Sequence, residues 1–205
     1  MDALTRRDLL KAGMAAGVAG AGLRGVDAGA ARSQSGPGRD APLVVPPIET
    51  VRIGFVGIGL QGGSHVENFL KIPGCRITAV CDIREERTTW ARHAIVAAGH
   101  PEPRAYTRGP RDFERLCDAE DLDLVFTATP WEWHVPVMLA AMKSGKHAAT
   151  EVPAAMFLDD CWAIVESAEK YRRHCVMMEN CNYDRPEMMV FNIVRQHLLG
   201  EVLHA

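Results

Sequence analysis

The chain has 205 residues, 47% of them hydrophobic and 24% charged, and carries a formal net charge of −3. This composition supports a folded core, and the weak negative charge gives no electrostatic reason to expect nucleic acid or an anionic membrane as a partner. Chemistry on a small molecule is therefore the better prediction. The cysteines are dispersed without a C-x-x-C pair, so we predict buried free thiols and neither a metal site nor a disulfide framework. They are Cys75, Cys81, Cys117, Cys161, Cys175 and Cys181.

Residues 1–31 have the features of a twin-arginine signal peptide. Arg6 and Arg7 lie in the sequence T-R-R-D-L-L-K, and residues 12–23 are weakly hydrophobic, rich in Gly and Ala, and too short for a stable membrane span. An A-x-A cleavage site at residues 28–30 places the mature start near Ala31. We therefore expect the twin-arginine export machinery as a partner and a periplasmic or extracellular location, with no membrane span in the mature protein. The alternative, an incidental N-terminal amphipathic helix, explains neither the arginine pair nor the cleavage site.

Residues 32–50 are rich in Pro, Gly and Ser and are predicted to be a linker or an arm. From residue 51 onward, strand and helix patterns alternate. The predicted strands cover residues 51–56, 76–82, 104–106, 122–129, 146–150 and 175–178, and the predicted helices cover residues 64–71, 84–99, 112–119, 136–143, 158–172 and 184–199. Repeated βα units of this length predict an α/β fold with a doubly wound parallel sheet.

A glycine loop follows the first predicted strand. Gly57, Gly59 and Gly62 have G-x-G-x-x-G spacing, which allows a tight turn, close approach of a pyrophosphate to bare backbone, and close packing of helix on strand. Asp82 ends the second strand 20 residues after Gly62, where a carboxylate can accept hydrogen bonds from both ribose hydroxyls of an adenosine. The sequence therefore predicts a dinucleotide site, although glycines alone also occur where a strand and a helix simply pack closely. Asp82 repels a 2′-phosphate and favours NAD over NADP, whereas Arg84 lies close enough to leave that preference open.

Ligands of such sheets bind beyond the carboxyl ends of the strands, so we expect the loops at these ends to form one crevice. Trp131 and Trp133 follow the fourth strand and can stack on a nicotinamide or a sugar, the alternative being a place in an interdomain core. His134 begins the next predicted helix, and a capping role is the alternative to a chemical one. Tyr183 is a candidate polar contact or base near a sugar, and a buried structural tyrosine is its alternative. Residues 201–205 have the pattern of an unfinished strand, which predicts a truncated sequence that lacks most of a second domain.

The order of these motifs resembles the Gfo/Idh/MocA-type oxidoreductases. Within that group, T-P-W-E-W-H at residues 129–134, E-V-P at 151–153, L-D-D-C-W at 158–162 and M-E-N-C-N-Y at 178–183 resemble glycoside hydrolase family 109, bacterial α-N-acetylgalactosaminidases that keep a bound NAD. The resemblance implies a Rossmann NAD-binding domain at residues 51–180 and the start of a truncated α/β substrate domain at 181–205, with the main catalytic residues beyond Ala205. The cofactor contacts that it implies, together with the glycine loop, are Gly57, Gly59, Leu60, Gln61, Gly62, Asp82, Trp131, Glu132, Trp133, His134, Glu151, Val152 and Asn180.

One residue, Val152, separates the resemblance to the wider oxidoreductase group from the resemblance to glycoside hydrolase family 109. Sugar dehydrogenases of the broader group usually have E-K-P, in which the lysine assists proton transfer, whereas Val152 cannot transfer a proton. The resemblance therefore implies a glycosidase that oxidises the sugar at C3, eliminates the aglycone, adds water and returns the hydride, with no net redox change. The alternatives are an NAD-dependent sugar or inositol dehydrogenase and an NAD-binding fragment without activity. We expect this chain alone to bind NAD weakly and to do no chemistry. The sequence leaves open the exact sugar, the anomer and the oligomeric state, including a homo-oligomer.

Overall fold

The computed structural model describes residues 43–119 and 121–204. The predicted signal peptide and the first part of the predicted linker lie outside these residues, and residues 43–50 contain no helix or strand. The chain forms two units, Met1–Val45 and Pro46–Ala205, and the fold described below belongs to the second. None of the helices in the described part of the chain is long and apolar enough to cross a bilayer.

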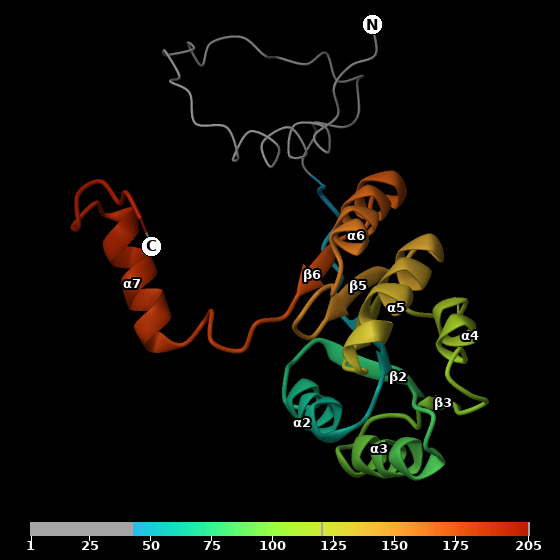
Figure 1. Cartoon of the computed structure of the whole chain (residues 1–205). Helices are drawn as coiled ribbons and strands as arrows, with labels where there is room; N and C mark the ends of the chain where they lie inside the picture. The colour runs from blue at the N-terminus through green and yellow to red at the C-terminus, as the bar shows by residue number, and fades with distance from the viewer. Residues whose placement is uncertain (1–42, 120, 205) are drawn as a thin grey trace, which may run out of the picture. The chain divides into compact units, whose positions relative to one another are not determined.

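Six parallel strands form one sheet, as predicted (Figure 1). They are β1 (Val51–Val56), β2 (Cys75–Cys81), β3 (Arg104–Tyr106), β4 (Leu124–Thr127), β5 (His147–Thr150) and β6 (Cys175–Met177). Their order across the sheet is β3-β2-β1-β4-β5-β6. The chain therefore runs from β1 outward to β3 at one edge of the sheet, and then from β4 outward to β6 at the other edge. A crevice is expected at the carboxyl ends of β1 and β4, where the two directions separate.

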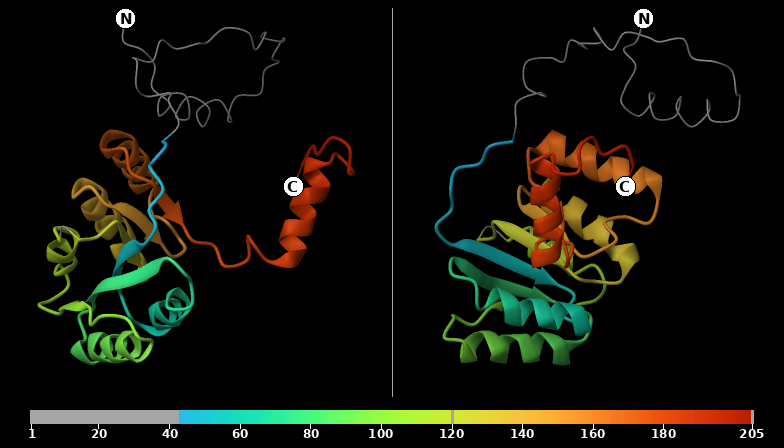
Figure 2. Two further views of the ribbon diagram at one scale, coloured as in Figure 1. Left: turned by 180° about the vertical axis from the view of Figure 1, so that it is seen from behind. Right: turned by 90° about the vertical axis from the view of Figure 1, so that its left-hand side faces the viewer.

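Helices cover both faces of this sheet, as Figure 2 shows. Helices α2 (Leu60–Phe69) and α3 (Glu85–Ala97) pack on one face, and α4 (Phe113–Cys117), α5 (Trp131–Lys143) and α6 (Leu158–Tyr171) pack on the other. Successive residues of β1 point to opposite faces because side chains alternate along a strand. Ile53 and Phe55 therefore join the core under α2 and α3, whereas Val56 joins the core under α4 and α5.

Two helices begin earlier than predicted, and both begin at the crevice. Helix α2 begins at Leu60 instead of residue 64, and α5 begins at Trp131 instead of residue 136. The N-caps are Gly59 and Pro130, and neither provides a side-chain capping bond, so the usual signal of a helix start is missing. Residues 131–134 therefore form the first turn of α5 and are not part of a loop.

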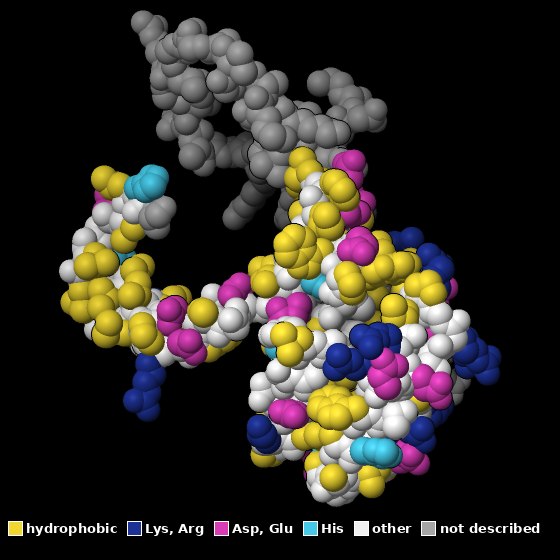
Figure 3. Space-filling model, turned by 60° about the horizontal axis from the view of Figure 1, so that its bottom comes forward, with side chains coloured by type: hydrophobic (Ala, Val, Ile, Leu, Met, Phe, Trp, Pro, Cys, Tyr) yellow, Lys and Arg dark blue, Asp and Glu magenta, His cyan; other side chains and the backbone are white. Residues whose placement is uncertain are grey.

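The C-terminal part of the chain differs most from the prediction. Helix α7 (Arg185–Arg195) has no buried residue, although its pattern predicts an apolar buried face; Figure 3 shows hydrophobic side chains gathered along it. The strand predicted at 201–205 is wrong, because residues 201–204 form no strand. Strand pairing needs a neighbour, which a local sequence pattern does not provide.

The prediction of buried free thiols is correct for some cysteines only. All six are free, and Cys81 and Cys117 are buried, but Cys161 and Cys181 are exposed. Burial raises the pKa of both Cys81 and Cys117 to about 12. These two thiols therefore behave as small hydrophobic core residues.

Candidate functional site

The glycine loop and Asp82 are hydrogen-bonded to each other. The Gly57 N–H donates to the Cys81 carbonyl over 2.8 Å, which continues the pairing of β1 with β2. The Ile58 N–H donates to Asp82 Oδ2 over 2.7 Å, and the Arg84 N–H donates to Oδ1 over 2.9 Å. The carboxylate is therefore fixed beside the loop, and each oxygen retains a lone pair for a ligand.

The three glycines of the loop meet different constraints. Gly57 has a φ of +83°, and a Cβ there would lie 2.8 Å from the backbone of Ala128. A Cβ on Gly62 would lie 2.0 Å from the Gly57 carbonyl oxygen, so helix and turn could not pack as they do. A Cβ on Gly59 would meet nothing within 4 Å. Two glycines thus serve the packing of the loop, and Gly59 leaves open space before the uncapped N-terminus of α2, which fits a pyrophosphate.

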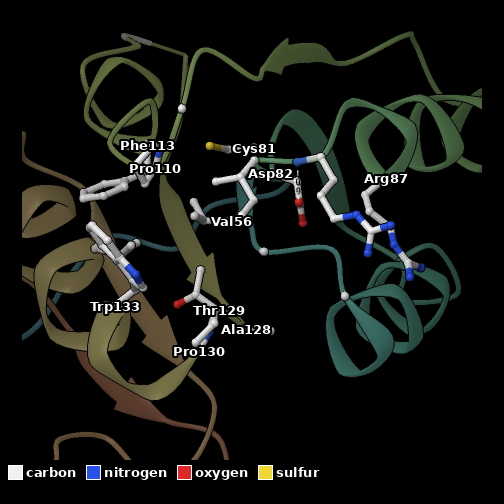
Figure 4. A pocket seen from close by; sticks show the side chains of 16 residues that line it. Val56, Cys81, Asp82, Arg87, Pro110, Phe113, Ala128, Thr129, Pro130 and Trp133 are labelled. Atoms are coloured by element: carbon white, nitrogen blue, oxygen red, sulfur yellow. Dashed lines mark hydrogen bonds between the residues drawn. The ribbon is translucent and has the colours of Figure 1, made fainter.

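A cavity of about 250 Å³ opens between the glycine loop, Asp82 and α5 (Figure 4). Of the predicted site residues, Gly57, Gly59, Asp82 and Trp133 line it. The Trp133 ring packs edge-on against Phe113, with ring centroids 6.0 Å apart. The structure therefore places Trp133 and Asp82 in the lining of one cavity, and the nicotinamide-side role that the resemblance implies for residues 131–134 stays a prediction.

Several lining residues carry no sequence signal. Phe113 and Pro110 follow β3, and Arg87 projects from α3; no motif marks them, because only the folded sheet brings these segments to Asp82. Arg84 also lines the cavity, but its guanidinium forms an exposed ion pair with Glu86 at 2.7 Å. Two arginines thus accompany one carboxylate at this wall, and the preference between NAD and NADP stays a prediction.

Glu151 lies outside the cavity lining and makes its contacts within the protein. Its Oε1 contacts His65 Nε2 and accepts a hydrogen bond from Gln61 Nε2 over 3.3 Å. Its Oε2 accepts a hydrogen bond from the N–H of the next residue, Val152, over 3.1 Å. Burial acts to raise the pKa of Glu151, but these hydrogen bonds outweigh burial, and the pKa lies below its usual value. His65 was not predicted as a site residue. It lies four residues after Gln61, a spacing that places both on one face of α2 once the early helix start is known.

His134 is likewise committed to protein contacts. Its side chain is 1% exposed, with Nδ1 2.7 Å from the Pro153 carbonyl oxygen and Nε2 2.9 Å from the Thr129 carbonyl oxygen. As the fourth residue of α5 it does not cap the helix. Each ring nitrogen lies within hydrogen-bond distance of a backbone carbonyl oxygen, and the buried ring does not line the cavity.

The remaining predicted residues do not line the cavity. Val152 is half-buried, and Tyr183 is 85% exposed, so the interpretation of Tyr183 as a buried structural residue is wrong. The others are exposed; they are Leu60, Gln61, Trp131, Glu132 and Asn180.

The sequence from residue 51 to 179 matches the GFO_IDH_MocA family, an oxidoreductase family with an NAD-binding Rossmann fold. A glycosyl hydrolase family 109 protein of Saccharopolyspora erythraea is 43% identical and aligns with 97% of this chain and 44% of its own length. An alpha-N-acetylgalactosaminidase of Shewanella oneidensis is 44% identical over 79% of this chain and 35% of its own length. The chain therefore spans less than half the length of these curated relatives.

Among solved structures, scyllo-inositol dehydrogenase from Lactobacillus casei with bound NAD(H) and scyllo-inositol is similar to this chain. The two superpose with a TM-score of 0.65 at 20% identity, over 74% of this chain and 43% of that chain. At this level of identity the likeness shows the fold.

Proposed function

Because this chain belongs to the GFO_IDH_MocA oxidoreductase family, we propose that its crevice binds NAD and that the protein is an NAD-dependent glycosidase acting on α-N-acetylgalactosaminides. One observation carries the cofactor site: Asp82 accepts hydrogen bonds from the glycine loop and lines the same cavity as Gly57 and Gly59. The glycosidase assignment is supported by relatives more than 40% identical. It is also supported by Val152, which stands where sugar dehydrogenases of the wider group have a proton-transferring lysine.

The residues at the crevice fit NAD by their chemistry. Asp82 would accept hydrogen bonds from the adenosine ribose, and the N–H groups that open α2 would bind the pyrophosphate. Trp133 and Phe113 add an aromatic surface to the lining of the same cavity. When bound, the nicotinamide accepts a hydride from the substrate and later returns it.

In the proposed reaction, the sugar loses a hydride from C3, which makes its C2 proton acidic. Loss of that proton expels the aglycone from C1, water adds across the new double bond, and C3 regains the hydride. This chain binds and orients the cofactor, and Val152 presents an aliphatic side chain where a lysine would transfer a proton. The family's oxidoreductase description keeps a dehydrogenase as the second candidate.

Protein purified from its native host distinguishes these functions. We expect it to release the aglycone of a chromogenic α-N-acetylgalactosaminide without accumulating reduced nicotinamide. Net reduction of NAD⁺ by the free sugar would instead establish a dehydrogenase. NAD binding without either reaction would leave a binding protein and would contradict the enzymatic proposal.

We also propose that residues 1–31 direct export by the twin-arginine pathway. A reaction without net redox change suits a compartment that holds no pool of free NAD, because the cofactor would be bound before export. A reporter fused to residues 1–50 should be exported, and replacing Arg6 and Arg7 by lysine should abolish export. Export of that double variant would contradict the proposal.

A further inference from the structure

The segment that follows β5 is contacted at each end by a different helix. Residues 151–153 leave the sheet beside β4, where the Glu151 N–H donates to the Thr127 carbonyl over 3.0 Å. Glu151 is contacted from α2 and Pro153 from α5, and Val152 lies half-buried between them. Because α2 and α5 cover opposite faces of the sheet, the segment is held from two sides.

On the α2 side, an imidazole meets a carboxylate. His65 Nε2 contacts Glu151 Oε1, and Gln61 Nε2 donates to the same oxygen over 3.3 Å. The His65 and Glu151 side chains are only 18% and 13% exposed, and the His65 ring packs on Phe126 with ring centroids 5.0 Å apart. This contact is therefore largely shielded from water and from salt.

On the α5 side, an imidazole joins two backbone segments. His134 lies between the carbonyl oxygens of Thr129, in the turn after β4, and Pro153, in the segment after β5. The neutral ring donates one of these hydrogen bonds, and the doubly protonated ring donates both. His134 thus fills the space between the ends of two neighbouring strands and donates a hydrogen bond to at least one of them.

These contacts lie on the side of the crevice opposite the predicted adenosine site. Asp82 follows β2 on one side of β1, and residues 151–153 follow β5 on the other side, beyond β4. A dinucleotide with its ribose at Asp82 and its pyrophosphate at the glycine loop extends its second half towards β4 and β5. We propose that His65 and His134 are positioning residues that clamp residues 151–153 for the nicotinamide half; this inference rests on the proposed NAD site.

The clamp acts by preorganisation. A segment fixed before binding loses little conformational freedom when the ligand arrives. If the segment is mobile, only the competent fraction of molecules binds, and the apparent Kd rises by the inverse of that fraction. AMP carries the adenosine and one phosphate and lacks the nicotinamide half, so it does not reach residues 151–153. Loss of the clamp should therefore weaken the binding of NAD⁺ and leave the binding of AMP unchanged.

Calorimetric titration of the His65→Leu chain with NAD⁺ and with AMP tests the α2 side. We expect about tenfold weaker binding of NAD⁺, the size expected for one lost hydrogen bond to a charged group, with AMP binding unchanged. Amide hydrogen exchange of the free protein should be faster at Glu151 and Val152. His65→Gln replaces a donor near the Nε2 position and should restore NAD⁺ binding. His93→Leu is the matched control, because His93 is exposed on α3 and does not line the cavity.

His134→Gln tests the α5 side with the same measurements, and the more accessible His65 decides the proposal if that variant does not fold. Unchanged NAD⁺ affinity in His65→Leu, an equal loss of affinity for NAD⁺ and AMP, or unchanged amide exchange at Glu151 and Val152 would each overturn the clamp. Failure of AMP to bind the unaltered chain is a different result, because it would overturn the proposed NAD site itself.

Discussion

Single residues of the glycine loop serve the protein and the ligand separately. Gly62 is required by the close approach of the Gly57 carbonyl, whereas Gly59 faces open space and has a negative φ that other residues can adopt. The sequence motif predicts such separate roles for the three glycines. The backbone positions give the steric part of them, because a Cβ on Gly62 would overlap the turn and a Cβ on Gly59 would meet nothing within 4 Å.

Alanine substitutions at these two glycines should therefore differ in their effects on stability and on NAD⁺ binding. Gly62→Ala is expected to lower the free energy of unfolding by at least about 2 kcal/mol, because its Cβ overlaps the backbone. Gly59→Ala should change stability by less than about 0.5 kcal/mol but weaken NAD⁺ binding, because the methyl group occupies the approach of the pyrophosphate. Denaturant unfolding measures the change in stability, and calorimetric titration measures the change in NAD⁺ affinity. Equal effects of the two substitutions on stability would contradict this assignment.

Trp133 gives the cavity an intrinsic fluorescence reporter. It lines the cavity, whereas Trp131, two residues earlier on α5, is 60% exposed and does not line it. NAD⁺ binding should change tryptophan emission in the unaltered chain and in Trp131→Phe. The change should be largely lost in Trp133→Phe. A full response from Trp133→Phe would show that the ligand binds away from this wall.

At the level of elements, the strands were more predictable than the starts of the helices. The third strand has the predicted bounds, and the glycine loop follows the first strand as expected, because apolar runs followed by glycine are strong local signals. The start of α5 was hidden because Pro136, which lies inside the helix, has the appearance of a first residue. That error placed residues 131–134 in a loop and concealed the buried position of His134 between two backbone carbonyl oxygens.

An ion pair joins β1 to the residue that precedes β4. Arg52 donates to Asp123 from its N–H, its Nε and its Nη2, over 2.8, 2.9 and 2.6 Å. These side-chain bonds hold the pKa of Asp123 below its usual value. A pKa lower in the folded state than in the unfolded chain stabilises the fold above about pH 3.9. That stabilisation is lost as the pH falls through the folded value.

Asp123→Asn should therefore lower the free energy of unfolding near pH 7 by about 1 kcal/mol, a modest value because Arg52 is partly exposed. The difference from the unaltered chain should shrink as the pH falls below about 4. Glu102→Gln is the control, since its ion pair with Arg92 lies at the surface. A difference that stays constant down to pH 2 would contradict this account.

For the whole molecule, the order of strands and helices was predictable from the sequence. Which apolar faces would be buried, and which segments would reach the cavity, was not. Alternating βα units specify a parallel sheet and place the glycine loop and Asp82 at the same edge. The apolar pattern of α7 predicts an apolar face but not the partner that would bury it, and Phe191 stays 53% exposed. In the same way, Phe113 and Arg87 reach the cavity through the tertiary fold and through no local motif.

The central claim is that Asp82 and the glycine loop form one NAD site. A crystal structure of this chain with NAD⁺ tests it most directly. The account predicts the adenosine ribose hydroxyls on the Asp82 carboxylate and the pyrophosphate before the first N–H groups of α2. NAD⁺ bound elsewhere, or bound with Asp82 facing no part of the ribose, would contradict it.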